Sequence, residues 1–485
     1  NCHKSHHYGC VLAGAQPYYV EAFPLTAYSM YGSVPLRTIK KALLDLKAAG
    51  RLGKVRMIAL TNVTFDGHMY DTRRVMEECL AIKPDLVFMW DEAWFGFARF
   101  NWLYRRRTAM GARQQLADWF ADPKSLEAYL EQEKAFGADL DPADARLLDA
   151  RLVPDPRVAR IRVYQTNSTH KSMSSLRQGS MVLVGDQDFH HHEAPFHEAV
   201  FTHASTSPNL QIIASLDVAR RQMELEGYEL VTHAIALAIE IRRHVNRHPL
   251  VSKYFRVLDP AEMIPTEFRA SGLASYTEAG VTWAQALQAY KGDEFVLDPT
   301  RLTLVCGTAG YDGTQFKGIL AADYGIQLNK TSRNSVLLQT NINNTRSDVA
   351  NLLRVLVEIS RKIEAGLKEG GAPAQEAFAK RVKSLMEDVP GLPNFSRFHE
   401  RFRSDPSGST LEGDMRSAFY MAYREECCEH RQLHDPEVAR RIEEGPPLVS
   451  ANFVIPYPPG FPIMVPGQVI EADTIEFMRK LDVKE

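Results

Sequence analysis

Apolar strands alternate with amphipathic helical patterns along the first hundred residues, and this alternation constrains the fold more than any other feature. Apolar residues recur at helical spacing over residues 34–49 and 72–82, and continuous apolar runs cover residues 55–60 and 86–90. Strands that alternate with helices pack into parallel, doubly wound α/β sheets. Such sheets bind their ligands beyond the carboxyl ends of their strands. We therefore expect an α/β fold with its site at that edge.

A polar stretch with a lysine, residues 165–173, follows a third β-prone run at residues 160–164. It places the amine of Lys171 beside hydroxyls and an imidazole at the end of a strand. A lysine held there loses water, which lowers its pKa and makes the amine nucleophilic toward a carbonyl. The alternative interpretation is a surface lysine on a loop, and the neighbouring motifs decide between the two.

A carboxylate lies directly after another strand, because the apolar run at residues 86–90 continues into Asp91. Parallel neighbouring strands end at the same edge of a sheet, so we expect Asp91 close to Lys171. An ordinary helix N-cap is the alternative interpretation of this aspartate.

The chain has 485 residues, too many for one core, so several domains are expected. Residues 101–157 are interpreted as a helical insertion with one amphipathic helix over residues 116–136. The further elements expected in the first half are a turn into a strand over residues 15–20, a strand at 181–184, a strand end with a hydroxyl-rich turn at 200–208, and a helix over 210–247 broken near Gly227.

A smaller α/β unit is expected over residues 248–365. Its expected elements are strands at residues 301–305 and 335–339, a glycine-rich turn at 307–313, and helices at 316–324 and 348–363. Glycines and a proline at residues 366–373 indicate a linker. The remainder is expected to be mostly helical, apart from a rigid, extended proline-rich segment at residues 456–462, and to end in a helix from Asp473.

Composition excludes several classes of function. The net charge of −3 does not favour binding to nucleic acid or to a membrane surface. The six cysteines are scattered without a CxxC pair, so neither a disulfide framework nor a zinc site is indicated, and a reducing cytoplasm is the expected compartment. No apolar run is long enough to predict a transmembrane helix.

Histidines gather at residues 190–192 and at His197, which suggests a metal site. Consecutive histidines cannot all face one ion, and no HExxH motif occurs, so a polar loop is the favoured interpretation and no metal is expected.

Six short segments occur in one order along nearly the whole chain. They are residues 1–5 (NCHKS), 61–67 (TNVTFDG), 91–100 (DEAWFGFARF), 168–171 (STHK), 206–208 (TSP) and 456–460 (PYPPG). With these segments the chain resembles the bacterial ornithine/lysine/arginine decarboxylases of the aspartate-aminotransferase-like fold (fold type I), which use pyridoxal 5'-phosphate (PLP). The resemblance implies a parallel-rich, doubly wound PLP domain, a smaller α/β domain and a mostly helical C-terminal region.

The resemblance also implies catalytic roles for three residues. Lys171 would form a Schiff base with the cofactor, Asp91 would keep the pyridine nitrogen protonated, and His3 would stack on the ring. A protonated ring is a better electron sink, and tuning the cofactor in this way is the task of the protein.

The remaining cofactor contacts that the resemblance implies surround the phosphate and the ring. Ser168 and His170 would reach the phosphate, and Ala93 and Trp94 would line the other side of the cofactor. Ser207 is a weaker phosphate candidate, donated across a dimer.

The implied reaction is decarboxylation of arginine, lysine or ornithine to an amine of polyamine metabolism and CO2, with a slight preference for arginine. Lys171 or an imidazole returns the proton to the α-carbon, and the sequence does not choose between them. Two alternatives stay open: another fold-type-I enzyme such as an aminotransferase, and a non-catalytic relative that regulates a true decarboxylase.

The expected domains are a PLP-binding large domain at residues 1–225, a small α/β domain at 226–370 and a C-terminal domain at 371–485. A homodimer or a higher homo-oligomer is expected. Because the sequence begins at Asn1, we expect a truncated chain without the family's N-terminal wing domain and phosphate-binding loop. A chain without that loop could bind PLP poorly or not at all, and could be inactive.

Overall fold

A four-stranded sheet in the order β3-β5-β6-β7 forms the centre of the N-terminal half. Its strands are β3 (Met57–Thr61), β5 (Val87–Asp91), β6 (Arg162–Asn167) and β7 (Met181–Asp186). The computed structural model describes residues 2–394, 397–405, 408, 410–456 and 460–480. The pairs β3–β5 and β5–β6 are parallel, as predicted, whereas β7 runs antiparallel to β6. The connection between β6 and β7, residues 168–180, contains only the four-residue helix α8, whereas a parallel return usually crosses over through a full helix.

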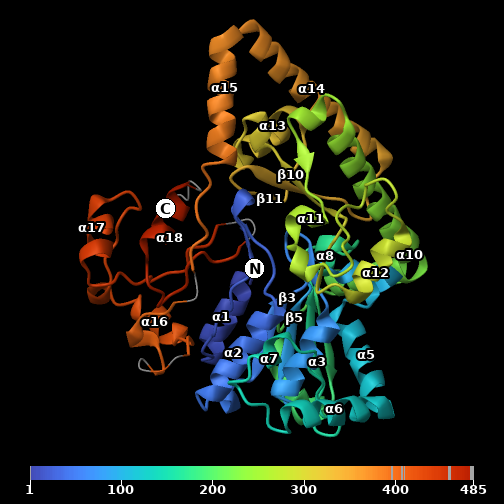
Figure 1. Cartoon of the computed structure of the whole chain (residues 1–485), viewed down its shortest axis with the longest axis vertical. Coiled ribbons are helices and arrows are strands. Elements are labelled where there is room, and N and C mark those ends of the chain that lie inside the picture. Colours follow the sequence, from blue (N-terminus) through green and yellow to red (C-terminus); the bar gives the residue numbers. More distant parts are fainter. Residues whose placement is uncertain (1, 395–396, 406–407, 409, 457–459, 481–485) are drawn as a thin grey trace.

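Helices α2 (Leu36–Ala48) and α3 (Thr72–Ile82) cover this sheet and confirm the two helices predicted from apolar spacing. Their apolar side chains join those of β5 in one buried cluster. Asp71 caps α3 by accepting a hydrogen bond from the amide of Arg74 at 3.0 Å. In Figure 1 these helices lie beside α5 and α7 below the edge of β3 and β5.

The predicted insertion at residues 101–157 is helical, but its long helix is divided. The structure has α4 (Trp102–Arg105), α5 (Ala109–Ala121), α6 (Pro123–Phe136) and α7 (Arg146–Asp149). The single helix predicted at residues 116–136 is wrong, because Asp122 caps α6 and Pro123 occupies its first turn. Proline there has no amide to continue the preceding helix.

The region after β7 is helical. Residues 200–208 were predicted as a strand end with a hydroxyl-rich turn, but residues 200–203 belong to α9 (Glu193–His203) and residues 204–208 form the turn after it. Pro195 lies in the first turn of α9, where a missing amide is tolerated. Helix α10 (Leu210–Arg247) runs for 38 residues without the predicted break. Gly227 allows α10 to pack closely against Phe100, because a Cβ at this position would lie 2.9 Å from the Cβ of Phe100.

A second sheet, in the order β11-β12-β10-β8, forms the smaller α/β unit, and its neighbouring strands are antiparallel. Its strands are β8 (Arg256–Val257), β10 (Arg301–Val305), β11 (Lys330–Thr331) and β12 (Ser335–Gln339). The strands predicted at residues 301–305 and 335–339 are confirmed. Helices α13 (Gly313–Tyr324) and α14 (Arg346–Glu369) pack against this sheet, together with the C-terminal half of α10.

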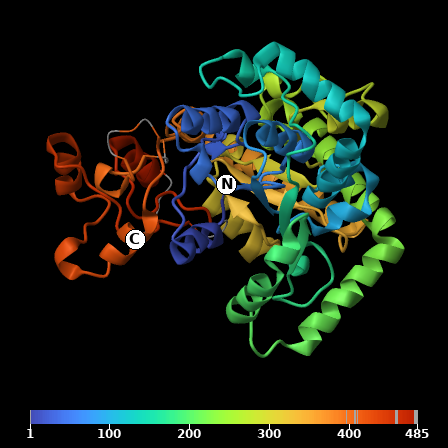
Figure 2. The ribbon, with the colours of Figure 1, turned by 90° about the horizontal axis from the view of Figure 1, so that it is seen from below.

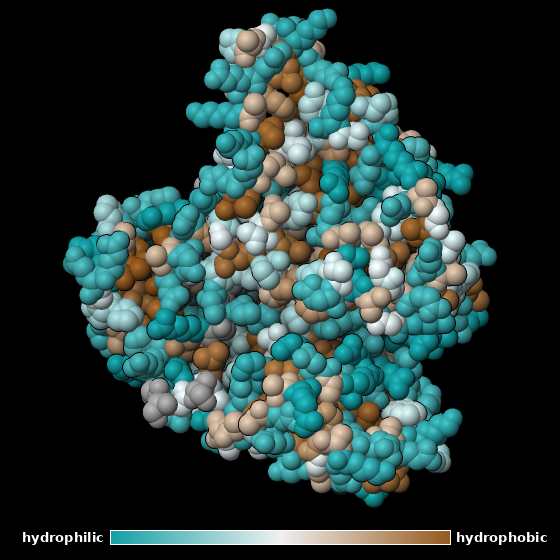
Figure 3. Space-filling model, viewed as in Figure 1, coloured by the Kyte–Doolittle hydropathy of each residue, from teal (hydrophilic) through white to brown (hydrophobic). Residues whose placement is uncertain are grey.

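The predicted linker at residues 366–373 is wrong. Helix α14 continues to Glu369, and α15 (Gly371–Met386) begins after one residue, so the glycines form a helical hairpin. Gly371 has a φ of 58°, a backbone conformation that glycine adopts easily. The hairpin rises above the small sheet in Figure 1, and apolar side chains gather between its helices in Figure 3.

The C-terminal region is less helical than predicted. It contains α16 (Met415–Met421), α17 (Pro436–Glu444) and α18 (Ala472–Lys480), joined by irregular chain and isolated β-bridges. The last helix, α18, confirms the helix predicted from Asp473. Pro446 and Pro447 lie in the irregular chain after α17, where proline cannot continue a helix. Of the predicted proline-rich segment at 456–462, residues 457–459 lie outside the described residues.

The N-terminal segment begins with α1 (Lys4–Ala13), which packs against the C-terminal region through Val11, Phe398, Met415 and Val465. Figure 2 shows α1 between the sheet and the C-terminal region. Residues 15–20 carry no strand, contrary to the prediction. The domain bounds at residues 225 and 370 stay a prediction.

The remaining short elements connect these layers. They are β1 (Pro24–Leu25), β2 (Met30–Tyr31), β4 (His68–Tyr70), β9 (Phe295–Leu297), α8 (Thr169–Ser172), α11 (Pro260–Met263) and α12 (Trp283–Gly292). The 3-10 helices are η1 (Thr26–Tyr28), η2 (Leu52–Lys54), η3 (Gly96–Phe100), η4 (Phe189–His191), η5 (Val251–Lys253), η6 (Thr266–Phe268), η7 (Gly307–Ala309), η8 (Glu400–Phe402) and η9 (Glu425–Cys427). Of the helices in the described ranges, none combines the length and the apolar run that a membrane crossing needs.

Candidate active site

The carboxyl ends of β5 and β6 bring the predicted carboxylate and the predicted lysine to one edge of the sheet. Asp91 is the last residue of β5 and is paired in register with Thr166 of β6. Lys171 lies on α8, the short helix that follows β6. The expectation that both residues share this edge is confirmed, because parallel neighbours end together.

Asp91 is held by hydrogen bonds from three sides. One carboxylate oxygen lies 2.9 Å from Nε2 of His6, and the other accepts from the amide of Ala93 at 3.0 Å and from the Thr166 hydroxyl at 3.5 Å. Burial alone raises the pKa of Asp91, but the hydrogen bond and charge of His6, the Ala93 amide and Lys171 outweigh it and lower the pKa below its usual value. Asp91 is therefore an anion at neutral pH.

Lys171 is half-buried against the aromatic ring of Trp94, with its Nζ 5.0 Å from the ring centroid. Burial lowers the pKa of Lys171, Asp91 opposes that change, and Arg301 lowers it further. The lowered pKa increases the share of neutral amine, the form that attacks a carbonyl.

His3 caps the N-terminus of α1 and accepts a hydrogen bond from the amide of Ser5 at 3.3 Å. Burial lowers the pKa of His3, and the charge of Lys171 lowers it further, while Asp91 opposes the change. The three residues predicted as catalytic are therefore close enough to influence one another's protonation.

His6 is a partner of Asp91 that sequence reasoning missed. It follows His3 by three positions, and residues three apart lie on the same side of a helix. That spacing was the available signal.

Ala93 and Trp94 connect the loop after β5 to its surroundings. The carbonyl of Ala93 accepts from the amide of Ser168 at 3.3 Å, which joins this loop to the loop after β6. The Trp94 ring meets the Phe65 ring edge to face at 5.4 Å between centroids. Both predicted residues therefore lie at the site.

Ser168 lies at the N-terminal end of α8, and His170 lies on this helix directly before Lys171. The Nδ1 of His170 lies 2.8 Å from the carbonyl oxygen of Gly179, an acceptor that requires a proton on this nitrogen. The hydroxyls of Thr169 and Ser172 are buried with no hydrogen-bond partner in the described part of the chain. These two hydroxyls next to Lys171 were not singled out from the sequence.

Ser207 is not brought to this edge. It lies in the exposed turn between α9 and α10, where its amide donates to the hydroxyl of Ser205 at 3.0 Å. None of its described contacts reaches the other predicted residues.

Glu92 lies next to Asp91, but the pKa of Glu92 is raised whereas that of Asp91 is lowered. One of its oxygens accepts from Asn62 Nδ2 at 2.9 Å and from the amide of Ala109 at 2.8 Å. The other oxygen is buried and has no partner among the described residues. Burial raises the pKa of Glu92 to about 8, so it is mostly neutral at pH 7 and adds little charge beside Asp91.

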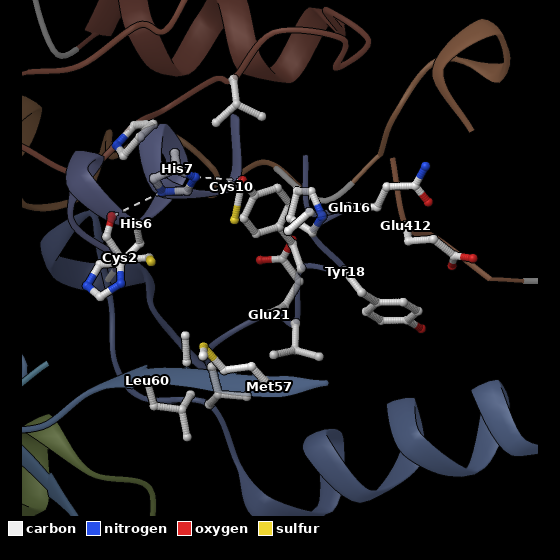
Figure 4. A pocket seen from close by; sticks show the side chains of 18 of the residues that line it. Cys2, His6, His7, Cys10, Gln16, Tyr18, Glu21, Met57, Leu60 and Glu412 are labelled. Atoms are coloured by element: carbon white, nitrogen blue, oxygen red, sulfur yellow. Dashed lines mark hydrogen bonds between the residues drawn. The ribbon is translucent and has the colours of Figure 1, made fainter. Parts of the chain in front are cut away.

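A cavity of about 670 Å³ opens between α1, β3 and the C-terminal region. His6 lines it, together with Tyr18, Glu21, Met57 and Glu412 (Figure 4). The carboxylate of Glu21 points toward its centre in that view. Because His6 also binds Asp91, the cavity borders the far side of the aspartate's hydrogen-bond network.

The predicted histidine cluster does not assemble into a site. His190 and His191 lie on η4, and His197 lies on α9 with an exposed side chain. Within the described ranges, no group of three or more histidine, cysteine, aspartate or glutamate side chains is arranged to hold a metal ion.

Comparison with known proteins identifies the relatives of this chain. A family model described as "Orn/Lys/Arg decarboxylase, major domain" matches residues 1–121 and 145–356. The unmatched residues 122–144 fall within the predicted insertion at 101–157.

Curated relatives share this similarity along almost the whole chain. "Lysine decarboxylase LdcA" of Pseudomonas aeruginosa is 26% identical over 517 residues, which cover 99% of this chain and 61% of the relative. "Biodegradative arginine decarboxylase" of Escherichia coli strain K12 is 24% identical and covers 96% of this chain and 60% of the relative. The chain thus spans about three fifths of the length of these relatives.

A solved structure shows the same fold. "Lysine decarboxylase A from Pseudomonas aeruginosa" superposes with a TM-score of 0.63 and 21% identity, and the match covers 100% of this chain and 61% of that structure. The expected α/β fold class is confirmed by this likeness.

Proposed function

This chain belongs to the Orn/Lys/Arg decarboxylase family, and from that premise we propose that it removes the α-carboxylate of a basic amino acid as CO2. The names of its relatives include lysine, arginine and ornithine decarboxylases, so the substrate class is a basic amino acid, and lysine, arginine and ornithine are all candidates. The observation that carries the proposal is that Asp91 and Lys171 lie together at the carboxyl ends of two adjacent parallel strands, β5 and β6.

Members of this family depend on PLP, and the residues at the sheet edge fit this cofactor. The set combines a depressed-pKa amine, a buried carboxylate, an aromatic ring and buried hydroxyls without partners. The amine matches the aldehyde of the cofactor, the carboxylate its ring nitrogen, the aromatic ring its ring face and the hydroxyls its phosphate. When bound, PLP supplies the electron sink for the bond that decarboxylation breaks.

Lys171 would hold the cofactor through its amine, which burial and Arg301 bias toward the neutral form. Asp91 would hold the ring nitrogen, since its pKa is low and His6 and Ala93 fix its orientation. His3 would cover the ring face.

Ser168 and His170 would bind the phosphate, because Ser168 lies at the N-terminal end of α8 and His170 lies on α8 directly before Lys171. Ala93 and Trp94 would bound the cofactor on the other side. Thr169 and Ser172 add two buried hydroxyls to the candidate donors.

The proposed reaction breaks the bond between the α-carbon and the carboxylate, releases CO2 and places one proton on the α-carbon. Lys171 and the His3 imidazole are the two candidate proton donors, since both lie at the site. The lowered pKa makes the Lys171 ammonium a better acid, whereas the lowered pKa of His3 leaves its imidazole mostly neutral at pH 7, which favours Lys171.

Two measurements test the proposal. The chain, incubated with PLP and then reduced with borohydride, should carry the cofactor mass on the peptide that contains Lys171. CO2 release from lysine, arginine and ornithine should exceed the release from neutral amino acids. Lys171→Ala should abolish both signals, while Lys124→Ala, at an exposed lysine of α6, should change neither.

Other outcomes favour the alternatives. Attachment of PLP with amino-group transfer and no CO2 release would indicate an aminotransferase. Absence of attachment to Lys171, with the Lys124 variant behaving identically, would contradict the enzyme and favour a regulatory relative.

A second copy of this chain is the proposed partner. Helix α9 and the N-terminal half of α10, residues 193–225, form an arm that stands off from the body in Figure 2. Its α10 half exposes apolar side chains at Leu210 (73%), Val218 (66%) and Leu225 (67%). An apolar face of this extent marks an interaction surface.

The arm also carries Ser207, which the site of its own chain does not use. A homodimer through this arm would donate Ser207 to the phosphate site of the partner copy. The proposed compartment is the cytoplasm, because no cysteine among the described residues forms a disulfide.

A further inference from the structure

Arg301 of β10 is a buried cation that reaches the site from the small α/β unit. It is 0% exposed. Its Nη2 donates to the carbonyl of Trp94 at 3.3 Å, and its Nη1 donates to Oε1 of Gln339 at 2.8 Å. The proposed reaction involves this guanidinium only through its effect on the pKa of Lys171.

The backbone around Arg301 is held by a second buried arginine. Arg242 donates to the carbonyl of Arg301 at 2.5 Å. Asp298 accepts from the Tyr104 hydroxyl at 2.9 Å and from the amide of Thr300 at 2.9 Å. These bonds fix the strand end from which the Arg301 side chain extends toward Trp94.

The charge of Arg301 is only loosely neutralised. Its Nε lies 3.7 Å from the nearest carboxylate oxygen of Asp298 and has no hydrogen-bond partner among the described residues. A guanidinium cannot deprotonate in a protein, so this position carries a permanent positive charge. Burial weakens the screening of that charge by water.

Trp94 is shared by two cations. The Nζ of Lys171 lies 5.0 Å from the ring centroid, and the Cζ of Arg301 lies 5.2 Å from it. Asp91 from β5 and Arg301 from β10 are the charged groups that change the pKa of Lys171, and Lys171 in turn lowers the pKa of His3 from α1. Asp91 favours the charged lysine, and Arg301 opposes it.

We propose that Arg301 is a positioning residue that fixes Trp94 beside Lys171 and, by its permanent charge, favours the neutral form of the lysine amine. The proposal rests on the function proposed above, in which a neutral Lys171 binds the cofactor aldehyde. Arg301 does not anchor a substrate carboxylate, because it has no exposed surface and both of its terminal nitrogens donate to the protein. The small unit would thereby tune the chemistry of a lysine that the large sheet presents.

The test measures the reactivity of Lys171 without cofactor. The full chain is acetylated with trace acetic anhydride across a pH series, and the extent at Lys171 is read by mass spectrometry against an exposed lysine such as Lys124. Only a neutral amine reacts, so the midpoint of the pH profile reports its protonation. A parallel series follows borohydride-trapped PLP on the same peptide.

Arg301→Gln removes the charge and should move the Lys171 midpoint upward, with a severalfold loss of labelling near pH 7. Arg301→Lys retains the charge and should keep the midpoint near that of the unmodified chain. Arg269→Gln is the matched control, since it removes another buried arginine, one whose hydrogen bonds go to the carbonyls of Ile264 and Leu273, and it should leave the midpoint unchanged.

Gln339→Glu keeps Arg301 in place if the glutamine variant of Arg301 does not fold. It puts a carboxylate at 2.8 Å from Nη1, neutralises the field of Arg301 and should move the midpoint in the same upward direction.

An unchanged midpoint in Arg301→Gln or Gln339→Glu would overturn the proposal, as would an equal shift in Arg269→Gln, which would indicate a merely structural role. Absence of CO2 release from the unmodified chain, together with a shifted acetylation midpoint in Arg301→Gln, would count against the proposed function alone. The two failures are therefore distinguishable.

Discussion

The sheet edge and the arm differ in how much of their chemistry lies within one chain. At the sheet edge, Asp91 is 7% exposed and its carboxylate is hydrogen-bonded from three sides. On the arm, Ser207 is exposed and the apolar residues of α10 face solvent. On the function proposed above, the comparison would mean that the site is divided between groups held within one chain and a serine that a second copy supplies.

The largest expected effect comes from breaking the sheet edge. Asp91→Asn keeps the shape of the side chain but removes the charge that would hold the ring nitrogen. Decarboxylation should fall by about 10²–10³-fold, the usual loss when one preorganised electrostatic contact is removed. CO2 release under saturating PLP is the measurement, and Asp118→Asn at an exposed position of α5 is the control. Activity near that of the control would remove Asp91 from the proposed mechanism.

The second prediction concerns the association of two copies of the chain through the arm. Leu210→Asp combined with Leu225→Asp places charges on its apolar face, and the dimer dissociation constant should rise by roughly 30-fold or more, as for a lost interface hot spot. Sedimentation against concentration measures it. Leu130→Asp on α6, which is 39% exposed, should leave association unchanged. Equal association of the double variant and the unmodified chain would show that the arm is not the interface.

The buried sheet edge should also reveal itself in the pH dependence of stability. The folded-state pKa of Glu92, about 8, lies above its ordinary value of 4.5, so the folded chain binds a proton that the unfolded chain releases between these pH values. Stability therefore falls as pH rises from about 5 to 8, by on the order of a few kcal/mol. Glu92→Gln should flatten that fall in urea titrations, and the exposed Glu229→Gln should not. A fall of the same size in Glu92→Gln would show that another group causes it.

The smallest effect concerns the half of α10 that packs against the body. Gly227→Ala would bring a Cβ to 2.9 Å from the Phe100 Cβ, so overpacking should outweigh the gain in helix propensity and cost about 1 kcal/mol. Gly318→Ala on α13 meets no atom within 4 Å and should stabilise by about as much. Thermal unfolding of both variants measures the difference. If both variants unfold at a higher temperature, η3 must move away to make room for the new Cβ, and the C-terminal half of α10 would be as loosely packed as its N-terminal half.

Local patterns predicted the elements that their own spacing specifies. Helix α3 and the strands at residues 301–305 and 335–339 were predicted with the bounds that the structure has. The arrangement of Asp91 and Lys171 also followed from sequence, because parallel register brings strand ends together. These predictions needed no knowledge of distant contacts.

Predictions failed where a contact distant in sequence, or a single capping residue, determines where a helix ends or which residue acts at the site. Gly227 was predicted to break α10, but it serves contact with Phe100, more than a hundred residues away. The linker at residues 366–373 is a hairpin because α14 and α15 pack on each other. His6 and Arg301 were missed because their roles exist only through contacts with Asp91 and Trp94.

The sequence by itself determined the α/β class, the strand ends that carry Asp91 and Lys171, and the family resemblance, because each depends on short-range pattern. Only the tertiary structure decided which groups set the protonation of those two residues. That property depends on burial and on charges brought from α1 and β10, since Coulomb interactions act through space and not along the chain.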